Sequence, residues 1–205
     1  MRELPILFSG PLVRAILDGT KTQTRRVIKA PGPWDVWEGR DMDPWPLRGP
    51  GQGARVPCPY GFPGDRLWVR ETCSLMTIEP VAGAVSRSLS TEEARQRTRF
   101  AADGTEPYGR WTPAIHMPRW ASRLTLEVTG VRVERLNDIS EADARAEGVA
   151  LQEKSLYMGA AAAAPHRFEF HRLWQQINGD RAPWLSNPWV WVVSFKRTTA
   201  PAGQG

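Results

Sequence analysis

The chain has 205 residues, which is long enough for one domain with insertions and a buried core. It is 41% hydrophobic and 24% charged, as globular proteins are, and its net charge of +5 favours anionic partners without by itself indicating a nucleic-acid-binding protein. Cys58 and Cys73 are the only cysteines and form no CxxC pair, so neither a disulfide framework nor a zinc site is supported, and no apolar run is long enough to cross a bilayer. We therefore expect a soluble, cytoplasmic protein with no metal and no cofactor.

The N-terminal residues predict a short strand followed by a helix. Residues 5–8 are apolar enough for a strand, Ser9 is a candidate N-cap, and Pro11 falls in the first helical turn, where its missing N–H costs nothing. Gly19 is placed to end the helix. The buried stripe of this helix is expected to comprise Leu12, Val13, Ile16 and Leu17.

Residues 19–26, with the sequence GTKTQTRR, follow that helix directly. They place one amine, three hydroxyls and two guanidinium groups in one short stretch. Such a cluster can bind an anion, or it can activate a hydroxyl if Lys21 loses its proton. A solvated basic loop is the alternative interpretation, and the residues alone do not decide between the two.

Two segments have the composition of insertions. Residues 31–64 are rich in Pro, Gly and Trp without a sustained periodicity, and their length favours a lid-like or other functional role over a passive connection. Residues 83–112 are polar and arginine-rich, and a short helix is expected at about residues 91–97. We expect a single domain over residues 1–197 and a disordered tail over residues 198–205.

The middle of the chain predicts two strands. Residues 67–71 form the first, which begins after a turn. In the second, Leu124, Leu126 and Val128 alternate with polar residues, and the apolar positions resume out of phase after Gly130. A bulge at Gly130 explains this shift and bends the strand, as small barrels require.

The last third of the chain predicts two helices and a closing strand. Ser140 is placed to cap a helix that ends at Gly148, and an amphipathic pattern over residues 170–177 marks another helix that stops at Gly179. Residues 189–195 are apolar enough for a central strand. The expected class is α+β: a small β-barrel with peripheral helices and two long insertions.

Four short blocks of the chain carry a recognisable pattern. Residues 16–26 contain a helix end and the signature G-x-K-T-x-T-x-R, and residues 64–69 contain G-D-x-L-x-V. Residues 126–129 and 190–196 have the character of later and closing strands. In this order the blocks resemble the ASCH domain, a small β-barrel related to the PUA RNA-binding module. They frame almost the whole of residues 4–197, although the two insertions have no counterpart in the minimal domain.

Within this superfamily the chain resembles the bacterial N4-acetylcytidine amidohydrolases, which hydrolyse the exocyclic amide of acylated cytidine with a Lys, a Thr and a Glu. The K-T-x-T spacing matches Lys21 and Thr24 to the first two. The Glu of the family lies on a helix after the later strand, and counting along the helix that Ser140 caps leads to Glu147. The resemblance thus implies these three catalytic residues and a small-molecule substrate, N4-acylated cytidine or cytosine. Without it, Glu147 is an ordinary surface carboxylate.

Two routes to amide hydrolysis are open for such a set. In the first, Thr24 attacks the acyl carbonyl, neutral Lys21 is its base, and Glu147 orients Lys21 or passes a proton to the departing nitrogen. In the second, Glu147 activates a water and Lys21 polarises the carbonyl. The sequence does not separate these routes.

Four more residues are candidates for binding the pyrimidine. Phe8 and Trp68 lie in blocks beside the expected site and offer stacking faces. Arg26 is a candidate for binding the base carbonyl or the oxyanion. Glu71 closes the strand at residues 67–71 and is either a structural ion-pair partner or a member of the site.

Two functions other than catalysis stay open. The PUA kinship and the net charge permit a non-catalytic RNA-binding module, with steep salt dependence and no turnover. A structural or regulatory protein that uses the barrel only for packing is the third interpretation. RNA is accordingly a second candidate partner, no membrane is expected, and the oligomeric state is left open.

Overall fold

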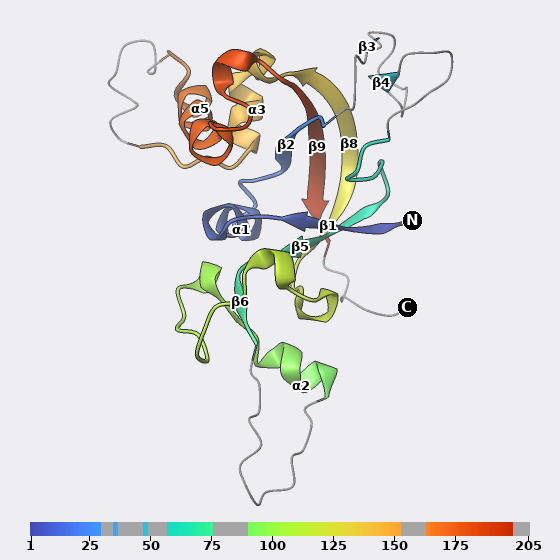
Figure 1. The fold of residues 1–205 in the computed structure, drawn as a ribbon, viewed down its shortest axis with the longest axis vertical. Coiled ribbons are helices and arrows are strands. Elements are labelled where there is room, and N and C mark those ends of the chain that lie inside the picture. Colours follow the sequence, from blue (N-terminus) through green and yellow to red (C-terminus); the bar gives the residue numbers. More distant parts are fainter. Residues whose placement is uncertain (30–34, 37–46, 49–56, 76–89, 153–162, 199–205) are drawn as a thin grey trace, which may run out of the picture.

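The structure, a computed structural model, describes residues 1–29, 35–36, 47–48, 57–75, 90–152 and 163–198. Its centre is a five-stranded mixed sheet with the strand order β1-β5-β8-β9-β2 (Figure 1). These strands are β1 (Glu3–Leu7), β2 (Gln23–Val27), β5 (Arg66–Arg70), β8 (Thr125–Arg135) and β9 (Trp189–Arg197). β1 and β5 are parallel and the other pairs are antiparallel.

Helices and two small sheets surround the central sheet. The helices are α1 (Gly10–Leu17), α2 (Thr91–Gln96), α3 (Glu141–Ala146) and α5 (Pro165–Asn178). The small sheets pair β3 (Asp35–Val36) with β4 (Leu47–Arg48) and β6 (Cys73–Ser74) with β7 (Arg99–Phe100). The 3-10 turns are Ala101–Asp103, Ala114–His116, Arg119–Ala121, Leu136–Asp138 and Trp184–Ser186. Helices and strands together confirm the predicted α+β class.

The central sheet has a core on each face. On one face α1 packs through Val13 and Ile16 against a cluster that includes Trp191 and Val193 of β9. On the other face the cluster contains Val190 and Val192 of the same strand, together with side chains of α3 and α5. Figure 1 shows α3 and α5 together at one end of the molecule, and α2 and β6 at the opposite end. A strand that is apolar on both faces is an interior strand, as predicted for β9.

Several predicted features are present in the structure. The register between β8 and β9 shifts between Val128 and Gly130, which confirms the predicted bulge. Ser140 accepts a hydrogen bond from the backbone N–H of Asp143 and so caps α3. Ser9 occupies the N-cap position of α1, but its side chain makes no capping hydrogen bond, in contrast to the prediction.

The two predicted insertions are described only in part. In the second, α2 confirms the predicted short helix, and β6 pairs with β7 to anchor the segment. Most of residues 31–64, the alanine-rich residues 160–162 and residues 199–205 lie outside the described residues. No helix in the described ranges is long and apolar enough to cross a membrane.

The central sheet is open in the described part of the chain, whereas a closed barrel was expected. β1 and β2 are the two edge strands and do not pair with each other. α1 carries the chain from the edge at β1 to the edge at β2 (Figure 1). The end of β1 and the start of β2 therefore border the same opening, and the candidate site lies there.

Candidate active site

Residues 19–26 are a turn and an edge strand rather than a solvated loop. Gly19 follows the end of α1 with φ +76°, a left-handed backbone conformation that glycine adopts without strain and residues with a Cβ do not. The chain then runs into β2, which pairs with β9 and places Thr24 opposite Val193. Lys21, Thr24 and Arg25 are all buried. Buried polar side chains at and just before an edge strand require partners, and the partners identify the site.

Lys21 forms a buried ion pair with Glu147, a residue 126 positions further along the chain. The Lys21 Nζ lies 2.8 Å from Glu147 Oε2, and the two residues are 2% and 4% exposed. The same amine donates to the Glu147 carbonyl at 2.9 Å and to the Gln23 carbonyl at 2.7 Å. All three donors of the ammonium are therefore used, and its head is held in one position.

The C-terminus of α3 brings Glu147 to this position. Glu147 is the C-cap residue of that helix and forms an isolated β-bridge with Lys21. The next residue, Gly148, has φ +72°, and a Cβ there would meet the Lys21 Cβ at 2.5 Å and the Ala15 Cβ at 2.9 Å. Glycine is thus required both for the backbone angle and for the close contact between the helix end and β2.

Arg25 neutralises the carboxylates around the pair. Its side chain is fully buried and donates to Glu147 Oε1 at 3.2 Å, to Asp143 Oδ2 at 3.1 Å and to Glu134. The guanidinium also donates to Gln23 Oε1 at 2.7 Å. Glu147 consequently has Lys21 on one oxygen and Arg25 on the other, which fixes the orientation of its carboxylate.

Burial lowers the pKa of Lys21 below its ordinary value. The loss of hydration is the largest cause, Glu147 opposes it, and the neighbouring charges of Arg26 and Arg25 reinforce it. A lysine whose pKa is lowered can release its proton more readily than a solvated lysine. The amine therefore has the property that a general base needs.

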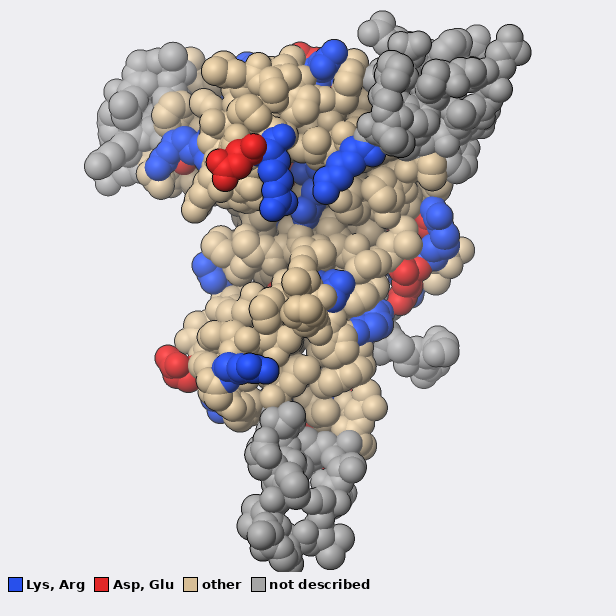
Figure 2. Space-filling model, viewed as in Figure 1, with Lys and Arg blue, Asp and Glu red and all other residues tan. Residues whose placement is uncertain are grey.

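A cavity of about 630 Å³ opens beside the pair. Its polar wall contains Lys21, Thr24, Arg25, Arg26 and Glu147. Phe8 and Leu12 at the start of α1 and the α5 side chains Phe170, Leu173, Trp174 and Ile177 form apolar walls. Figure 2 shows a hollow on this face between the end that carries α5 and the part that carries α1, with Lys and Arg side chains on its rim and floor. The cavity has the size and the mixed lining of a small-molecule site.

Arg26 and Phe8 lie together in this cavity, as the resemblance implies for substrate-binding residues. The guanidinium carbon of Arg26 is 5.3 Å from the centre of the Phe8 ring, and its Nη2 donates to the Leu7 carbonyl at the end of β1. This hydrogen bond links the two edge strands across the opening. The Arg26 Nε is buried and has no hydrogen-bond partner in the described part of the chain, so one donor of this guanidinium is unsatisfied.

Trp68 and Glu71 lie elsewhere, and neither is among the residues that line the cavity. Trp68 is flanked by the guanidinium groups of Arg70 and Arg119, at 5.4 Å and 5.7 Å from its ring centre. Glu71 is 1% exposed and forms a two-point ion pair with Arg123, at 2.9 Å and 3.0 Å. Of the seven candidate site residues, the structure thus brings together Lys21, Thr24, Glu147, Arg26 and Phe8.

The structure also adds residues to the candidate site. Gly148, the α5 side chains and the carboxylate partners of Arg25 could not be placed there from the sequence, because each depends on a contact between distant segments. A partial signal existed in α5, whose apolar pattern predicts a buried face but not what that face contacts. Among the described residues no group of three or more His, Cys, Asp or Glu side chains could hold a metal ion.

Comparisons with known proteins give one structural similarity. Neither a protein-family model nor a curated protein sequence matches the chain. A crystal structure of an ASCH domain from Lactobacillus crispatus is similar, with a TM-score of 0.37 and 13% sequence identity over 96% of this chain and 79% of that chain. That domain is of the family that the sequence blocks resemble. At this TM-score and identity we draw no conclusion from the likeness about the fold, the activity or the substrate.

Proposed function

We propose that the protein is an amidohydrolase that removes the acyl group from the exocyclic amine of N4-acylated cytidine or cytosine. One observation carries the proposal: a buried lysine, a carboxylate and a threonine, drawn from two distant segments, line one wall of a cavity that also contains an aromatic ring and an arginine. The resemblance to the N4-acetylcytidine amidohydrolases supplies the substrate class, and the lowered pKa of Lys21 supports the chemistry.

The chemistry requires Lys21 to be a neutral amine when the substrate reacts. Thr24 Oγ1 then forms a bond to the acyl carbon as its proton passes to Lys21 Nζ. The C–N bond breaks, and the amine of cytidine leaves with a proton returned from Lys21. A water molecule next attacks the acyl-threonine ester, with the same amine as base, and releases the carboxylic acid.

Glu147 and Arg25 hold the amine in place in this scheme. Because Glu147 and the Gln23 carbonyl accept hydrogen bonds from Lys21, the nitrogen cannot rotate away from the cavity wall when its proton is lost. Arg25 holds the far oxygen of Glu147 and so keeps the carboxylate in this orientation. The proposed role of Glu147 is therefore to position Lys21.

Phe8 and Arg26 are the proposed contacts for the pyrimidine. Phe8 lines the cavity and is the proposed aromatic contact for the cytosine ring. The guanidinium of Arg26, which also lines the cavity, is proposed to donate to the base carbonyl or to the oxyanion that forms when the acyl carbon is attacked. An amide oxygen that gains negative charge gains most from a charged donor in a site with little water.

The direct test is the ultraviolet change that accompanies conversion of N4-acetylcytidine to cytidine by the purified protein. We expect turnover, and a loss of at least about 10²-fold for Lys21→Ala and for Thr24→Ala. Thr22→Ala is the matched control, because Thr22 is exposed, lies on the same segment and does not line the cavity. Lack of turnover by the folded protein across several N4-acylcytidines would rule out the proposal.

A second measurement separates the two chemical routes. With a slowly hydrolysed acyl group, mass spectrometry of the enzyme during turnover should show an acyl adduct on the peptide that contains Thr24. Near-normal turnover by Thr24→Ala would instead favour direct attack by water, with Lys21 as the group that polarises the carbonyl.

A further inference from the structure

The cavity carries more positive charge than hydrolysis of a neutral nucleoside requires. In the described part of the chain five cationic side chains line it and Glu147 is the single carboxylate among the lining residues. Two of the cations, Lys29 and Arg181, are exposed. Lys29 follows β2 and Arg181 follows α5, so the two cations reach the cavity from different elements.

Among the described residues, the buried cations Lys21 and Arg25 are already paired with carboxylates, whereas Arg26 and the exposed Lys29 and Arg181 are not. Lys21 and Arg25 bind Glu147, and Arg25 also binds Glu134 and Asp143. For Lys29 and Arg181 no carboxylate lies within ion-pair distance among the described residues, although Asp180 precedes Arg181 in the chain. The two exposed cations without a carboxylate, Lys29 and Arg181, are thus at the mouth of the cavity. Figure 2 shows Lys and Arg side chains around a hollow on this face.

We propose that the preferred substrate is phosphorylated, with Lys29 and Arg181 binding a phosphate of an N4-acylcytidine nucleotide while the acylated base enters toward Lys21. This inference rests on the proposed function, because it places the base in that site. A phosphate accepts several charge-assisted hydrogen bonds and matches the guanidinium and ammonium groups of such a pair. The phosphate is that of a mononucleotide or of an RNA chain, and the two sources share the same chemistry.

The distribution of charge favours a phosphate over a second neutral group. A neutral nucleoside gains nothing from exposed cations at the mouth, whereas an anion is attracted to them before it enters the cavity. The gain in affinity from this attraction is moderate, because the two side chains are exposed and salt screens their charges. We expect about a tenfold preference for the phosphorylated compound at low salt.

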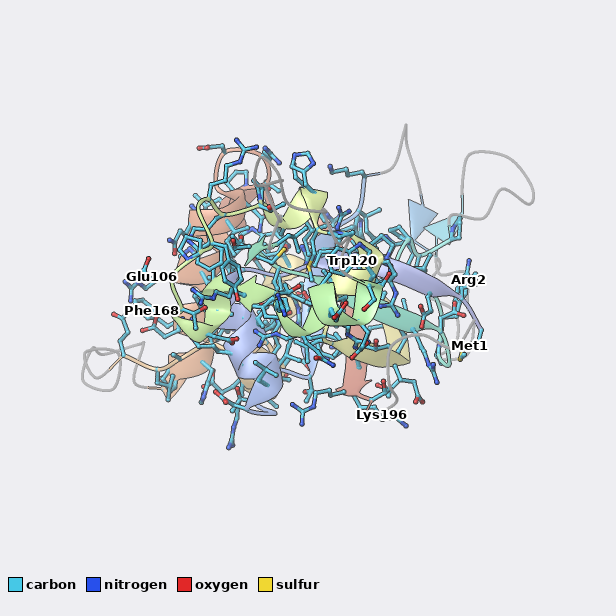
Figure 3. All side chains as sticks on the ribbon, turned by 90° about the horizontal axis from the view of Figure 1, so that it is seen from below. Met1, Arg2, Glu106, Trp120, Phe168 and Lys196 are labelled. Atoms are coloured by element: carbon cyan, nitrogen blue, oxygen red, sulfur yellow. The ribbon has the colours of Figure 1, made fainter. Side chains whose placement is uncertain are left out.

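The test measures binding of the products, so it does not depend on catalysis. Calorimetry compares cytidine, cytidine 5′-monophosphate and a short cytidine-containing RNA on the full chain. The variant combines Lys29→Ala with Arg181→Ala. Both positions are exposed, so we expect the variant to fold like the unmodified protein. Lys196→Ala is the matched control, since Lys196 is exposed, does not line the cavity and projects from the far end of β9 (Figure 3).

The expected result is that the monophosphate binds about tenfold more tightly than cytidine, that this ratio falls toward one in the double variant, and that the control retains it. Stronger binding of the RNA, lost in the same variant, would identify a chain as the source of the phosphate. A monophosphate no tighter than cytidine, or a ratio unchanged in the double variant, would overturn the inference.

The outcomes also separate this inference from the proposed function. Turnover of N4-acetylcytidine without a phosphate preference leaves the hydrolase and removes the phosphate site. A phosphate preference that depends on Lys29 and Arg181, without turnover of any N4-acylated compound, removes the hydrolase and leaves a nucleotide-binding site. Binding of none of the three ligands overturns the phosphate inference, and the turnover assay then decides on the hydrolase by itself.

Discussion

Two buried carboxylates, Glu147 and Glu71, look alike in the sequence and differ in the structure. Each is almost fully buried, each is paired with a basic side chain, and each was a candidate site residue. Glu147 lines the cavity, whereas Glu71 does not. Glu71 is held by Arg123, which also binds Asp103 and lies 4.0 Å from the centre of the Phe100 ring.

The partner of each carboxylate determines what the pair can do. Arg123 keeps its proton at any accessible pH, so its pair with Glu71 can only hold structure together. Lys21 has a lowered pKa and borders a cavity, so its pair with Glu147 can take part in proton transfer. Burial and ion pairing therefore do not identify a site unless a group that can titrate meets open space.

The largest expected effect comes from exchanging the two kinds of cation. Lys21→Arg keeps the charge but cannot supply a neutral amine, and its larger fork does not fit the three acceptors of the Lys21 head. We expect turnover of N4-acetylcytidine to fall by about 10³-fold. Arg123→Lys is the control and should leave the rate within about threefold, because that pair has no part in the chemistry. Equal losses in both variants would contradict the distinction.

A large loss of stability is expected at the other pair. Arg123→Ala leaves Glu71 buried without its cation, and such a change costs about 3 kcal/mol of the free energy of unfolding. Burial already raises the pKa of Glu71, with Arg123 opposing the shift, so the carboxyl takes up a proton more readily in the variant. Denaturant unfolding measures the loss of stability. The rate at which the folded fraction turns over N4-acetylcytidine should stay near that of the unmodified protein. A tenfold fall in that rate would place Glu71 in the site.

The pH dependence of kcat/KM distinguishes the two uses of Lys21. If its neutral amine is the base, the rate rises with pH through the lowered pKa and then levels off. If its ammonium polarises the carbonyl, the rate falls over the same range. The pH dependence of stability is the same for both uses of Lys21. At pH values between the lowered pKa of Lys21 in the folded protein and its ordinary pKa in the unfolded chain, the unfolded chain holds more protons. The free energy of unfolding therefore rises with pH in this range. Lys21→Met should flatten that part of the stability profile.

The smallest effect is expected at an exposed Lys–Glu pair. Lys196 and Glu127 lie 3.0 Å apart on neighbouring strands, with side chains 62% and 36% exposed. A double-mutant cycle with Lys196→Ala and Glu127→Ala should give a coupling energy below about 1 kcal/mol, with no change in turnover. The corresponding cycle at Lys21 and Glu147 should give about 3 kcal/mol. Similar values for the two pairs would mean that burial does not distinguish them.

Much of the fold could be predicted because its signals are local. The helix that ends at Gly19, the cap at Ser140 and the bulge near Gly130 each follow from a few neighbouring residues, and the structure contains all three features. The openness of the sheet could not be predicted. Whether β1 meets β2 depends on the twist and length of all five strands, to which no single segment contributes a readable pattern.

The candidate site was predictable in its parts and not in its assembly. The family resemblance implied Lys21 and Thr24 through their spacing and Glu147 through a count along a helix, yet no local pattern shows that Glu147 reaches Lys21. That contact needs the left-handed Gly148, which lets the end of α3 approach β2. Trp68 illustrates the opposite case: it lies in a block of the family pattern, but the structure places it against Arg70 and Arg119.

By itself the sequence determined the chemical groups, their local elements and the net positive charge, because these depend on residue type and short-range geometry. Only the tertiary structure decided which groups meet: it buried Lys21 against Glu147, opened a cavity between the two sheet edges and placed at its mouth Lys29 and Arg181, which have no carboxylate partner among the described residues. The reason is physical. A pKa and a binding site arise from burial and from charges that are distant in the chain, and these exist only when the chain is packed.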